Sequence, residues 1–234
     1  MTDSGTYDLI VIGGGITGLG TARDCAMRGL KVLLVERNDI ASGASGRNHG
    51  LLHSGARYAV KDSESAVECI SENRILKNIA PHCIEDGGGL FITLPEDEDC
   101  GYGLDYQRNF VDACKKAGIN AEIIDPREAL KAEPSVNPDL IGAVRVPDAS
   151  VDPFKLCAAN MLDALNRGAT ILPYTEVTRL LMEGGKVIGI STVNTRTGVK
   201  GEYRAPVTVN AAGIWGQHIA ELAGCVIRML PAKG

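Results

Sequence analysis

The sequence predicts an α/β fold that opens with a strand–helix–strand unit and continues into a β-meander and part of an α+β region. Residues 8–12 (DLIVI) and 31–35 (KVLLV) are short apolar runs, which are typical of strands buried on both faces. Between them lie a glycine cluster and a stretch with apolar residues on one side. That stretch ends at Gly29, which favours a left-handed helix end. The crossover of such a unit is nearly always right-handed.

The later elements are marked by caps and turns. Asp125-Pro126 and Asp152-Pro153 predict helix starts, because each joins a capping carboxylate to a proline at the first helical position. Further expected elements are a helix over 62–80, a strand over 89–94, an acidic surface loop over 95–103, a β-meander over 169–209 and a strand over 207–213.

Composition and charge exclude several classes of protein. With 44% hydrophobic and 23% charged residues, the 234-residue chain is an ordinary globular sequence. Its net charge of -5 provides no basic stripe for nucleic acid. No apolar run of ~18 residues and no signal-peptide pattern is present, so we expect a cytoplasmic protein. The seven cysteines include no C-x-x-C pair, which predicts reduced thiols and no metal site.

The strongest functional signal is GGGITG at residues 13–18, which fits the pattern G-x-G-x-x-G. Gly13 permits a tight turn, Gly15 lets the backbone approach a pyrophosphate, and Gly18 lets the helix pack against the strand. The N-terminal amides of the following helix attract phosphate. Glu36, at the end of the second strand, can accept hydrogen bonds from both ribose hydroxyls of an adenosine, and its charge disfavours a 2′-phosphate. This context predicts dinucleotide binding.

The loop that follows favours a flavin over a nicotinamide dinucleotide. Residues 41–58 (ASGASGRNHGLLHSGARY) are rich in glycine and serine, whose small size lets backbone amides and hydroxyls approach a flavin ring and its phosphates. An ordinary flexible loop seldom ends in Leu-Leu-His followed by Arg-Tyr. The roles of two residues remain undecided at this point. Arg37 can stack on the adenine or lie exposed, and Trp215 can stack on the flavin or pack against the protein.

Four segments together resemble the D-amino-acid oxidase superfamily of FAD enzymes. They are GGGITG with Glu36, the loop SGASGRNHGLLHSGARY, VDPFKL at 151–156 and VNAAGIWG at 209–216. Within it, the chain is most similar to FAD-dependent glycerol-3-phosphate dehydrogenases, in particular to the N-terminal part of the large catalytic subunit of the anaerobic, quinone-linked type. The resemblance implies an FAD-binding Rossmann-like α/β domain of the glutathione-reductase and D-amino-acid-oxidase type, with a β-meander and part of an α+β substrate domain.

The resemblance also implies a division of the chain. Residues 1–80 and 151–225 are the two expected segments of the FAD-binding domain, residues 81–150 are part of the substrate domain, and residues 226–234 begin a further substrate-domain segment. Because family members continue well past residue 234, we expect a fragment that binds FAD but has little activity alone.

The family's cofactor contacts map onto residues of the motif, the loop and the two later segments. They are Gly13, Gly14, Gly15, Thr17, Gly18, Glu36, Arg37, Ser45, Asn48, Gly50, Leu51, Val177, Ala211 and Gly213. His53 and Arg57 are the expected catalytic residues, and Arg57 and Tyr58 the expected substrate contacts. Histidine is the natural proton acceptor near neutral pH, and the guanidinium fork suits a phosphate.

Several alternatives remain for these side chains. His53 can be a hydrogen-bonded structural histidine, with the base supplied from beyond residue 234, and Arg57 can belong to a surface ion pair. We expect His82 and His218 to be structural.

The function implied by the resemblance is oxidation of sn-glycerol 3-phosphate to dihydroxyacetone phosphate, with electrons passing from FAD to quinone. The implied partners are further flavoprotein and iron–sulfur subunits that attach the cytoplasmic assembly to the inner face of the membrane. One alternative is an amine, amino-acid or 2-hydroxyacid oxidase of the same superfamily, because one arginine does not distinguish carboxylate from phosphate. Another is an inactive flavin-binding fragment or assembly module.

Overall fold

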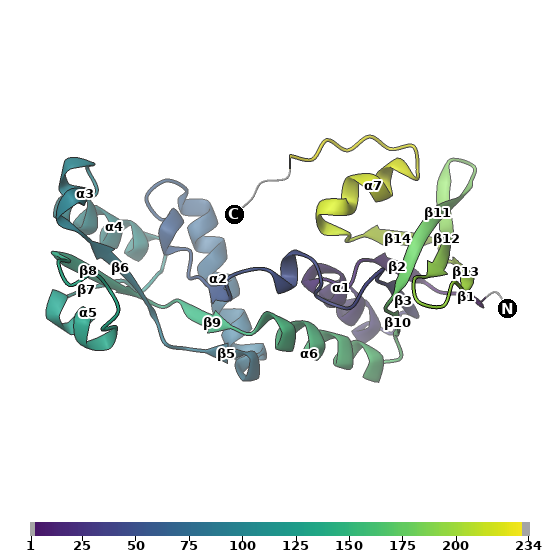
Figure 1. Cartoon of the computed structure of the whole chain (residues 1–234), viewed down its shortest axis with the longest axis horizontal. Helices are drawn as coiled ribbons and strands as arrows, with labels where there is room; N and C mark the ends of the chain where they lie inside the picture. Colours follow the sequence, from purple (N-terminus) through teal and green to yellow (C-terminus); the bar gives the residue numbers. More distant parts are fainter. Residues whose placement is uncertain (1–2, 231–234) are drawn as a thin grey trace. The chain divides into compact units, whose positions relative to one another are not determined.

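The computed structural model describes residues 3–230 and divides into two compact units (Figure 1). The first unit combines the residues up to His49 with those from Pro153 onward, and the second is Gly50–Asp152. The expected segment 226–234 lies partly outside the described residues.

The centre of the first unit is a parallel sheet with strand order β10-β3-β2-β14. Its strands are β2 (Leu9–Ile12), β3 (Val32–Val35), β10 (Thr170–Leu172) and β14 (Val207–Asn210). Every residue of β2 and β3 is buried, which is why both strands are continuous apolar runs. The expected strand–helix–strand unit is therefore present, and Gly29 adopts the expected left-handed conformation after its helix, at φ +83°.

Two helices cover one face of this sheet and a second sheet covers the other. The helices are α1 (Ile16–Met27) and α6 (Pro153–Asn166), which are joined by an ion pair of 2.6 Å between Arg23 and Asp163. In β2, Leu9 and Val11 share a core with α1, whereas Ile10 and Ile12 share a core with the second sheet. Alternate residues of one strand thus serve both faces.

The second sheet of this unit is the β-meander, with strand order β1-β13-β12-β11. Its strands are β1 (Asp3–Thr6), β11 (Thr175–Glu183), β12 (Lys186–Asn194) and β13 (Lys200–Arg204). Gly184 and Gly185, at φ +56° and +77°, form the tight turn between β11 and β12. The expected meander over 169–209 is too long, because β10 and β14 belong to the parallel sheet and only β11 to β13 form the hairpins.

The rest of the first unit consists of short helices at the loops. They are the 3-10 helices η1 (Ala44–Gly46) and η4 (Gly213–Trp215) and the α-helix α7 (Gly216–Glu221). The expected strand over 207–213 ends at Asn210, where the chain turns towards η4.

The second unit is an α+β arrangement with two antiparallel sheets of three strands. One sheet contains β6 (Gly89–Thr93), β8 (Gly142–Val146) and β7 (Glu122–Ile124), and the other β4 (Leu51–Leu52), β9 (Ala149–Val151) and β5 (Ile84–Glu85). Its helices are η2 (Ala56–Tyr58), α2 (Ser63–Ile79), η3 (Pro81–Cys83), α3 (Pro95–Asp99), α4 (Leu104–Lys116) and α5 (Pro126–Ala132). Asp125 caps α5 as expected, accepting from the Arg127 N–H at 2.7 Å.

Two features of this unit differ from expectation. The boundary between the units lies after His49 rather than after residue 80, because α2 shares a core with α4, in which Ile70 and Phe110 are both buried. The acidic stretch after residue 94 is not a simple loop, because it begins with helix α3. There Pro95 takes the first helical position and Asp97 accepts the Leu94 N–H at 2.7 Å, which provides a start signal within the acidic run.

Candidate functional site

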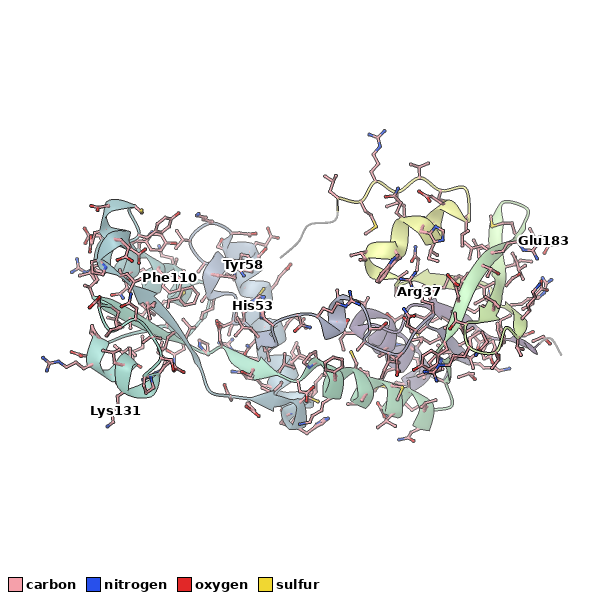
Figure 2. All side chains as sticks on the ribbon, in the orientation of Figure 1. Arg37, His53, Tyr58, Phe110, Lys131 and Glu183 are labelled. Atoms are coloured by element: carbon pink, nitrogen blue, oxygen red, sulfur yellow. The ribbon has the colours of Figure 1, made fainter. Side chains whose placement is uncertain are left out.

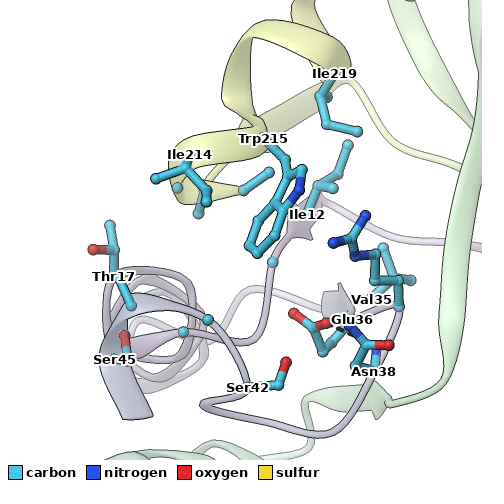
Figure 3. A pocket seen from close by; sticks show the side chains of 18 of the residues that line it. Ile12, Thr17, Val35, Glu36, Asn38, Ser42, Ser45, Ile214, Trp215 and Ile219 are labelled. Atoms are coloured by element: carbon cyan, nitrogen blue, oxygen red, sulfur yellow. Dashed lines mark hydrogen bonds between the residues drawn. The ribbon is translucent and has the colours of Figure 1, made fainter. Parts of the chain in front are cut away.

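A pocket of about 420 Å³ lies in the first unit at the carboxyl ends of β2 and β3 (Figure 3). Ligands of open α/β sheets bind at this edge, and the volume is within the range of small-molecule sites. The lining residues come from the loop after β2, the end of β3, the loop before and after η1, the start of β11 and the segment around η4.

The glycines of the motif have two different roles. Gly13 has φ +115°, and a Cβ there would overlap the Ala211 carbonyl, while a Cβ on Gly18 would overlap the Gly13 carbonyl oxygen. These two glycines are required by the packing of the strand, the turn and the helix. Gly15 has an ordinary extended conformation, and a Cβ there would meet Ser45 Oγ at 3.0 Å. Because Gly15 lines the pocket, its missing side chain leaves space for a ligand.

The N-terminus of α1 is open towards the pocket. Gly15 is the N-cap and supplies no side-chain cap, and the first turn contains no acidic residue. The Ile16 N–H donates to Ser45 Oγ at 2.9 Å, and the hydroxyl of Ser45 keeps its own proton to donate. With Thr17 also in the lining, this end offers amides, hydroxyls and the positive end of the helix dipole, which together suit a pyrophosphate.

Glu36 lies at the other end of the lining, where β3 ends. Its Oε2 accepts the Gly14 N–H and its Oε1 accepts the Asn38 N–H, each at 2.8 Å. Each carboxylate oxygen has a further lone pair, so the group can still accept the hydroxyls of a ribose. Gly14 and Gly18, both expected to contact the cofactor, do not line the pocket: Gly14 holds Glu36, and Gly18 packs against Gly13.

Arg37 and Trp215 form a stacked pair on the wall of the pocket. The guanidinium carbon lies 4.2 Å from the centre of the indole ring, and both residues line the pocket. The far edge of the indole approaches Gly43, where a Cβ would lie 3.3 Å from Cζ3. Figure 3 shows the ring of Trp215 pointing into the pocket rather than into the core.

The other expected cofactor residues divide between the two units. Five of them line the pocket: Ser45, Asn48, Val177, Ala211 and Gly213. Gly50 and Leu51 belong to the second unit and are not among the residues that line this pocket. There the Gly50 carbonyl accepts the Val151 N–H at 2.7 Å, and Leu51 pairs with Ser150 in the β4–β9 ladder.

The structure also brings residues to the pocket that sequence reasoning missed. They are Ile12, Ile16, Val35, Asn38, Ser42, Gly43, Ala44, Thr175, Glu176, Ala212, Ile214, His218 and Ile219. Ile12 and Val35 end parallel strands, and this position is a signal that the sequence did contain. The residues of β11 and η4 carry no comparable signal, because long-range packing brings them there. His218, expected to be structural, lines the pocket.

The expected catalytic residues His53 and Arg57 lie in the second unit, where Figure 2 labels His53 and its neighbour Tyr58. The rings of His53 and Tyr58 meet edge to face, with centroids 5.7 Å apart and planes at 72°. The Arg57 guanidinium carbon lies 5.4 Å from the centre of the same tyrosine ring. His53 Nδ1 and Ser54 Oγ are buried without a hydrogen-bond partner among the described residues. Buried polar atoms are normally paired, so two unpaired ones side by side in the sequence are unusual.

The turn that holds this cluster is fixed by neighbouring elements. The Ser54 N–H donates to Oδ1 of buried Asp148 at 2.6 Å, and Asn73 on α2 donates to the Leu52 carbonyl at 3.1 Å. Gly55 has φ +86°, and a Cβ there would lie 2.7 Å from the Cβ of Cys69. The short sequence His-Ser-Gly-Ala-Arg-Tyr therefore has a defined conformation rather than that of a flexible loop.

Two other kinds of site are absent from residues 3–230. Within that range no group of three or more histidine, cysteine, aspartate or glutamate side chains is arranged to hold a metal ion. None of the helices described is long and apolar enough to cross a membrane.

Known proteins resemble the chain over nearly its whole length. A subunit of the anaerobic glycerol-3-phosphate dehydrogenase of Escherichia coli (strain K12) is 64% identical over 232 residues, which cover 99% of this chain and 42% of that protein. The corresponding subunit of the Haemophilus influenzae enzyme is 60% identical over 227 residues, covering 97% of this chain and 39% of that protein. The chain thus spans about two fifths of the length of these relatives.

The fold also matches a solved structure. The X-ray structure of a glycerol-3-phosphate dehydrogenase from Bacillus halodurans, complexed with FAD, superposes with a TM-score of 0.69 at 28% identity, over 93% of this chain and 36% of that chain. The family described as FAD dependent oxidoreductase, DAO, matches residues 8–234. The expected FAD-binding α/β fold is therefore confirmed, and the chain belongs to the family of FAD-dependent oxidoreductases.

Proposed function

We propose that this chain is the cofactor-binding part of an enzyme that oxidises sn-glycerol 3-phosphate to dihydroxyacetone phosphate. The observation that carries the proposal is the 64% identity with the subunit of the E. coli anaerobic glycerol-3-phosphate dehydrogenase, spread over 99% of this chain. Family membership alone does not choose the substrate, because one fold can support many reactions.

The pocket of the first unit has the features that FAD requires. Gly15 leaves room beside the start of α1, where amides and the hydroxyls of Thr17 and Ser45 would hold the pyrophosphate. Glu36 would accept the ribose hydroxyls of the adenosine. Bound FAD would supply the acceptor for the hydride that leaves the substrate carbon.

The second unit would supply the groups that act on the substrate. Oxidation of a secondary alcohol also releases the hydroxyl proton, and the imidazole of His53, whose buried Nδ1 has no hydrogen-bond partner among the described residues, would accept it. Arg57 would bind the phosphate through its fork of N–H donors, and Tyr58 would hold both side chains by its ring contacts. Gly50 and Leu51 would contact the cofactor from this unit.

The proposed partner subunits are supported by the names of the similar proteins and not by the pocket. Both curated relatives are named as one subunit of an enzyme, which supports an assembly of several subunits. Further flavoprotein and iron–sulfur subunits would carry electrons from this chain to quinone. Such an assembly would be cytoplasmic and peripheral on the inner face of the membrane.

The test uses flavin reduction under anaerobic conditions. A fusion of this chain to the remaining part of the E. coli relative would be mixed with glycerol 3-phosphate, glycine, an amine and lactate in separate experiments. We expect rapid bleaching of the flavin absorbance with glycerol 3-phosphate alone, as in the unmodified E. coli protein used as the control. Bleaching by an amino acid, amine or 2-hydroxyacid instead would overturn the substrate assignment. A flavin that none of these compounds bleaches would favour a binding or assembly module.

A further inference from the structure

Asp148 is a buried carboxylate in the second unit, where it lies between strands β8 and β9. Its residue is only 6% exposed. A Cβ at Gly89, the first residue of β6, would lie 2.9 Å from the Cβ of Asp148, so the glycine leaves room for this side chain. A buried carboxylate is costly unless it accepts hydrogen bonds, and its partner therefore indicates what it does.

The partner of Asp148 is the backbone directly after His53. The Ser54 N–H donates to Oδ1 of Asp148 at 2.6 Å, across 94 positions of the sequence. Hydrogen bonds to a charged acceptor are about twice as strong as those between neutral groups. The segment that carries Asp148 is itself held by α2, because Lys77 Nζ donates to the Pro147 carbonyl at 2.9 Å. Asp148 thus fixes the peptide group that joins His53 to Ser54.

The imidazole of His53 depends on this backbone contact for its position. Its buried Nδ1 has no hydrogen-bond partner among the described residues. The ring packs edge to face on Tyr58, with centroids 5.7 Å apart (Figure 2). A catalytic base is usually oriented by a third group bonded to its ring. Because Nδ1 has no such bond here, the backbone held by Asp148 and the packing on Tyr58 determine where the ring lies.

Arg57 is held by different contacts. It belongs to η2, in which the Tyr58 N–H donates to the Gly55 carbonyl at 2.9 Å. Gly55 in turn approaches α2 so closely that a Cβ there would lie 2.8 Å from the Ala66 carbonyl oxygen. Neither contact involves Asp148. A change at Asp148 should therefore displace His53 more than Arg57.

We propose that Asp148 is a positioning residue for proton transfer, which orients the imidazole of His53 by holding the Ser54 N–H. This inference rests on the proposed function above, in which the substrate carbon loses a hydride to FAD and the substrate hydroxyl loses its proton to His53. Asp148 acts on this step through the backbone and not by contact with the substrate.

The kinetic test measures flavin reduction in stopped flow, in the fusion with the remaining part of the E. coli relative and at saturating glycerol 3-phosphate. Partial unfolding lowers the amplitude of the bleaching, whereas misplacement of His53 lowers its rate constant. Asp148→Ala removes the acceptor, so the rate constant should fall by about 10- to 100-fold. Asp148→Asn keeps a neutral acceptor of the same shape and should lower it by about 3- to 10-fold. The dissociation constant of glycerol 3-phosphate should change little in both variants.

Asp125→Ala is the matched control. Asp125 lies in the same unit and also accepts a backbone N–H, that of Arg127 at 2.7 Å, but at the start of α5. Its loss should lower the melting temperature and leave the rate constant of flavin reduction unchanged.

Nuclear magnetic resonance of the flavin-free chain gives a readout that does not depend on turnover. In Asp148→Ala the imidazole resonances of His53 should shift and the Ser54 amide should exchange faster with solvent. In Asp125→Ala both signals should match those of the unaltered chain.

The outcomes distinguish this inference from the proposed function. If glycerol 3-phosphate bleaches the unaltered fusion and Asp148→Ala keeps its rate constant, the inference is wrong and the proposed function stands. Asp148→Asn decides in the same way if the alanine variant does not fold. A folded alanine variant no slower than the asparagine variant would also overturn the inference, because the neutral acceptor would then give no rescue. If glycerol 3-phosphate does not bleach the unaltered fusion, both proposals are overturned together.

Discussion

The backbone N–H of Gly14 donates a 2.8 Å hydrogen bond to Oε2 of Glu36, which joins the glycine turn after β2 to the end of β3. Glu36 is thereby held in place before a ligand arrives, and less side-chain entropy is lost on binding. The contact also explains the middle glycine of the turn. A Cβ at Gly14 would lie 2.9 Å from the Cβ of Glu36 and would push the carboxylate away.

Replacing Glu36 with Gln tests the carboxylate directly. The side-chain amide of glutamine has one oxygen and one NH2 group, and the NH2 group cannot accept an N–H. Either the Gly14 N–H or the Asn38 N–H therefore loses its acceptor, and the charge-assisted hydrogen bonds to the ribose are lost as well. Such bonds contribute about 1.5–3 kcal/mol, so the affinity for FAD should fall by about one to two orders of magnitude. Calorimetric titration of the flavin-free chain measures this loss.

The control for this change is Glu183→Gln, which removes the same charge from an exposed position at the end of β11. Its dissociation constant should equal that of the unaltered chain. An unchanged affinity in Glu36→Gln would mean that Glu36 is a solvated strand end that takes no part in binding.

Two alanine variants of the α1 region should separate binding from folding. Gly15→Ala places a Cβ in the pocket, where Ser45 Oγ is the nearest neighbour at 3.0 Å, and its backbone conformation suits alanine. FAD binding should be lost while the melting temperature of the flavin-free chain stays close to that of the unaltered chain. Gly20→Ala, within helix α1 itself, is the matched control, since nothing lies within 4 Å of its Cβ position. It should bind FAD normally.

Gly18→Ala should give the opposite result. Its Cβ would overlap the Gly13 carbonyl oxygen, so the helix must move away from the turn. Overpacking of this kind costs about 1–3 kcal/mol, which thermal unfolding of the flavin-free chain would detect. Equal stability of the Gly15 and Gly18 variants would contradict the two separate roles, in which Gly15 leaves space for the ligand and Gly18 allows the helix to pack against the turn.

The elements that were predictable from the sequence are those with local signals. The apolar strands β2 and β3 and the left-handed Gly29 follow from residues close together in the chain. The position of β10 did not follow, because Thr170–Leu172 has the composition of a meander strand but pairs in parallel with β3, which lies far away in the sequence.

The same distinction between local signals and long-range packing applies to the candidate site. Glu36 and Gly15 were found because their spacing from the strands is fixed by the strand–helix–strand unit. The pairing of Arg37 with Trp215 was not found, because the two residues meet only after β14 has joined β2. Tertiary pairing of this kind leaves no periodic pattern in either segment, and a single sequence therefore leaves the role of Trp215 undecided.

Cys114 predicts a specific dependence of stability on pH. Burial, and secondarily the nearby Asp148 carboxylate, raise the pKa of this thiol from 9.0 to about 11 in the folded chain. The unfolded chain therefore loses the proton first as the pH rises. The stability of the folded state is intact below about pH 9 and should fall by about 2–3 kcal/mol between pH 9 and pH 11.

Cys114→Ala isolates this effect from other groups that titrate in alkali. The variant should be less stable at neutral pH because it leaves a small cavity in the core around Phe110, but its stability should fall less steeply above pH 9. Urea unfolding at several pH values gives both curves. Parallel curves for the variant and the unaltered chain would contradict the assigned pKa.

Arg57 and His53 should have separable effects in the fusion with the remaining part of the E. coli relative. Arg57→Ala removes the proposed phosphate contact, so kcat/KM for glycerol 3-phosphate should fall by about 10- to 100-fold, while the weak reaction with unphosphorylated glycerol should change little. Lys131→Ala, which removes an exposed positive charge from α5, is the control for net charge. Equal losses for both substrates in the arginine variant would remove Arg57 from the phosphate site.

His53→Asn should act on the chemical step instead. Asparagine can form hydrogen bonds in the turn but cannot accept a proton near neutral pH, so the rate of flavin reduction at saturating substrate should fall by about 100- to 10,000-fold. The dissociation constant of glycerol 3-phosphate should change little, because Arg57 and Tyr58 remain. The decisive measurement is the rate of flavin reduction at saturating substrate in stopped flow. A variant that keeps the full rate would assign the base to another residue and leave His53 the role of packing against Tyr58.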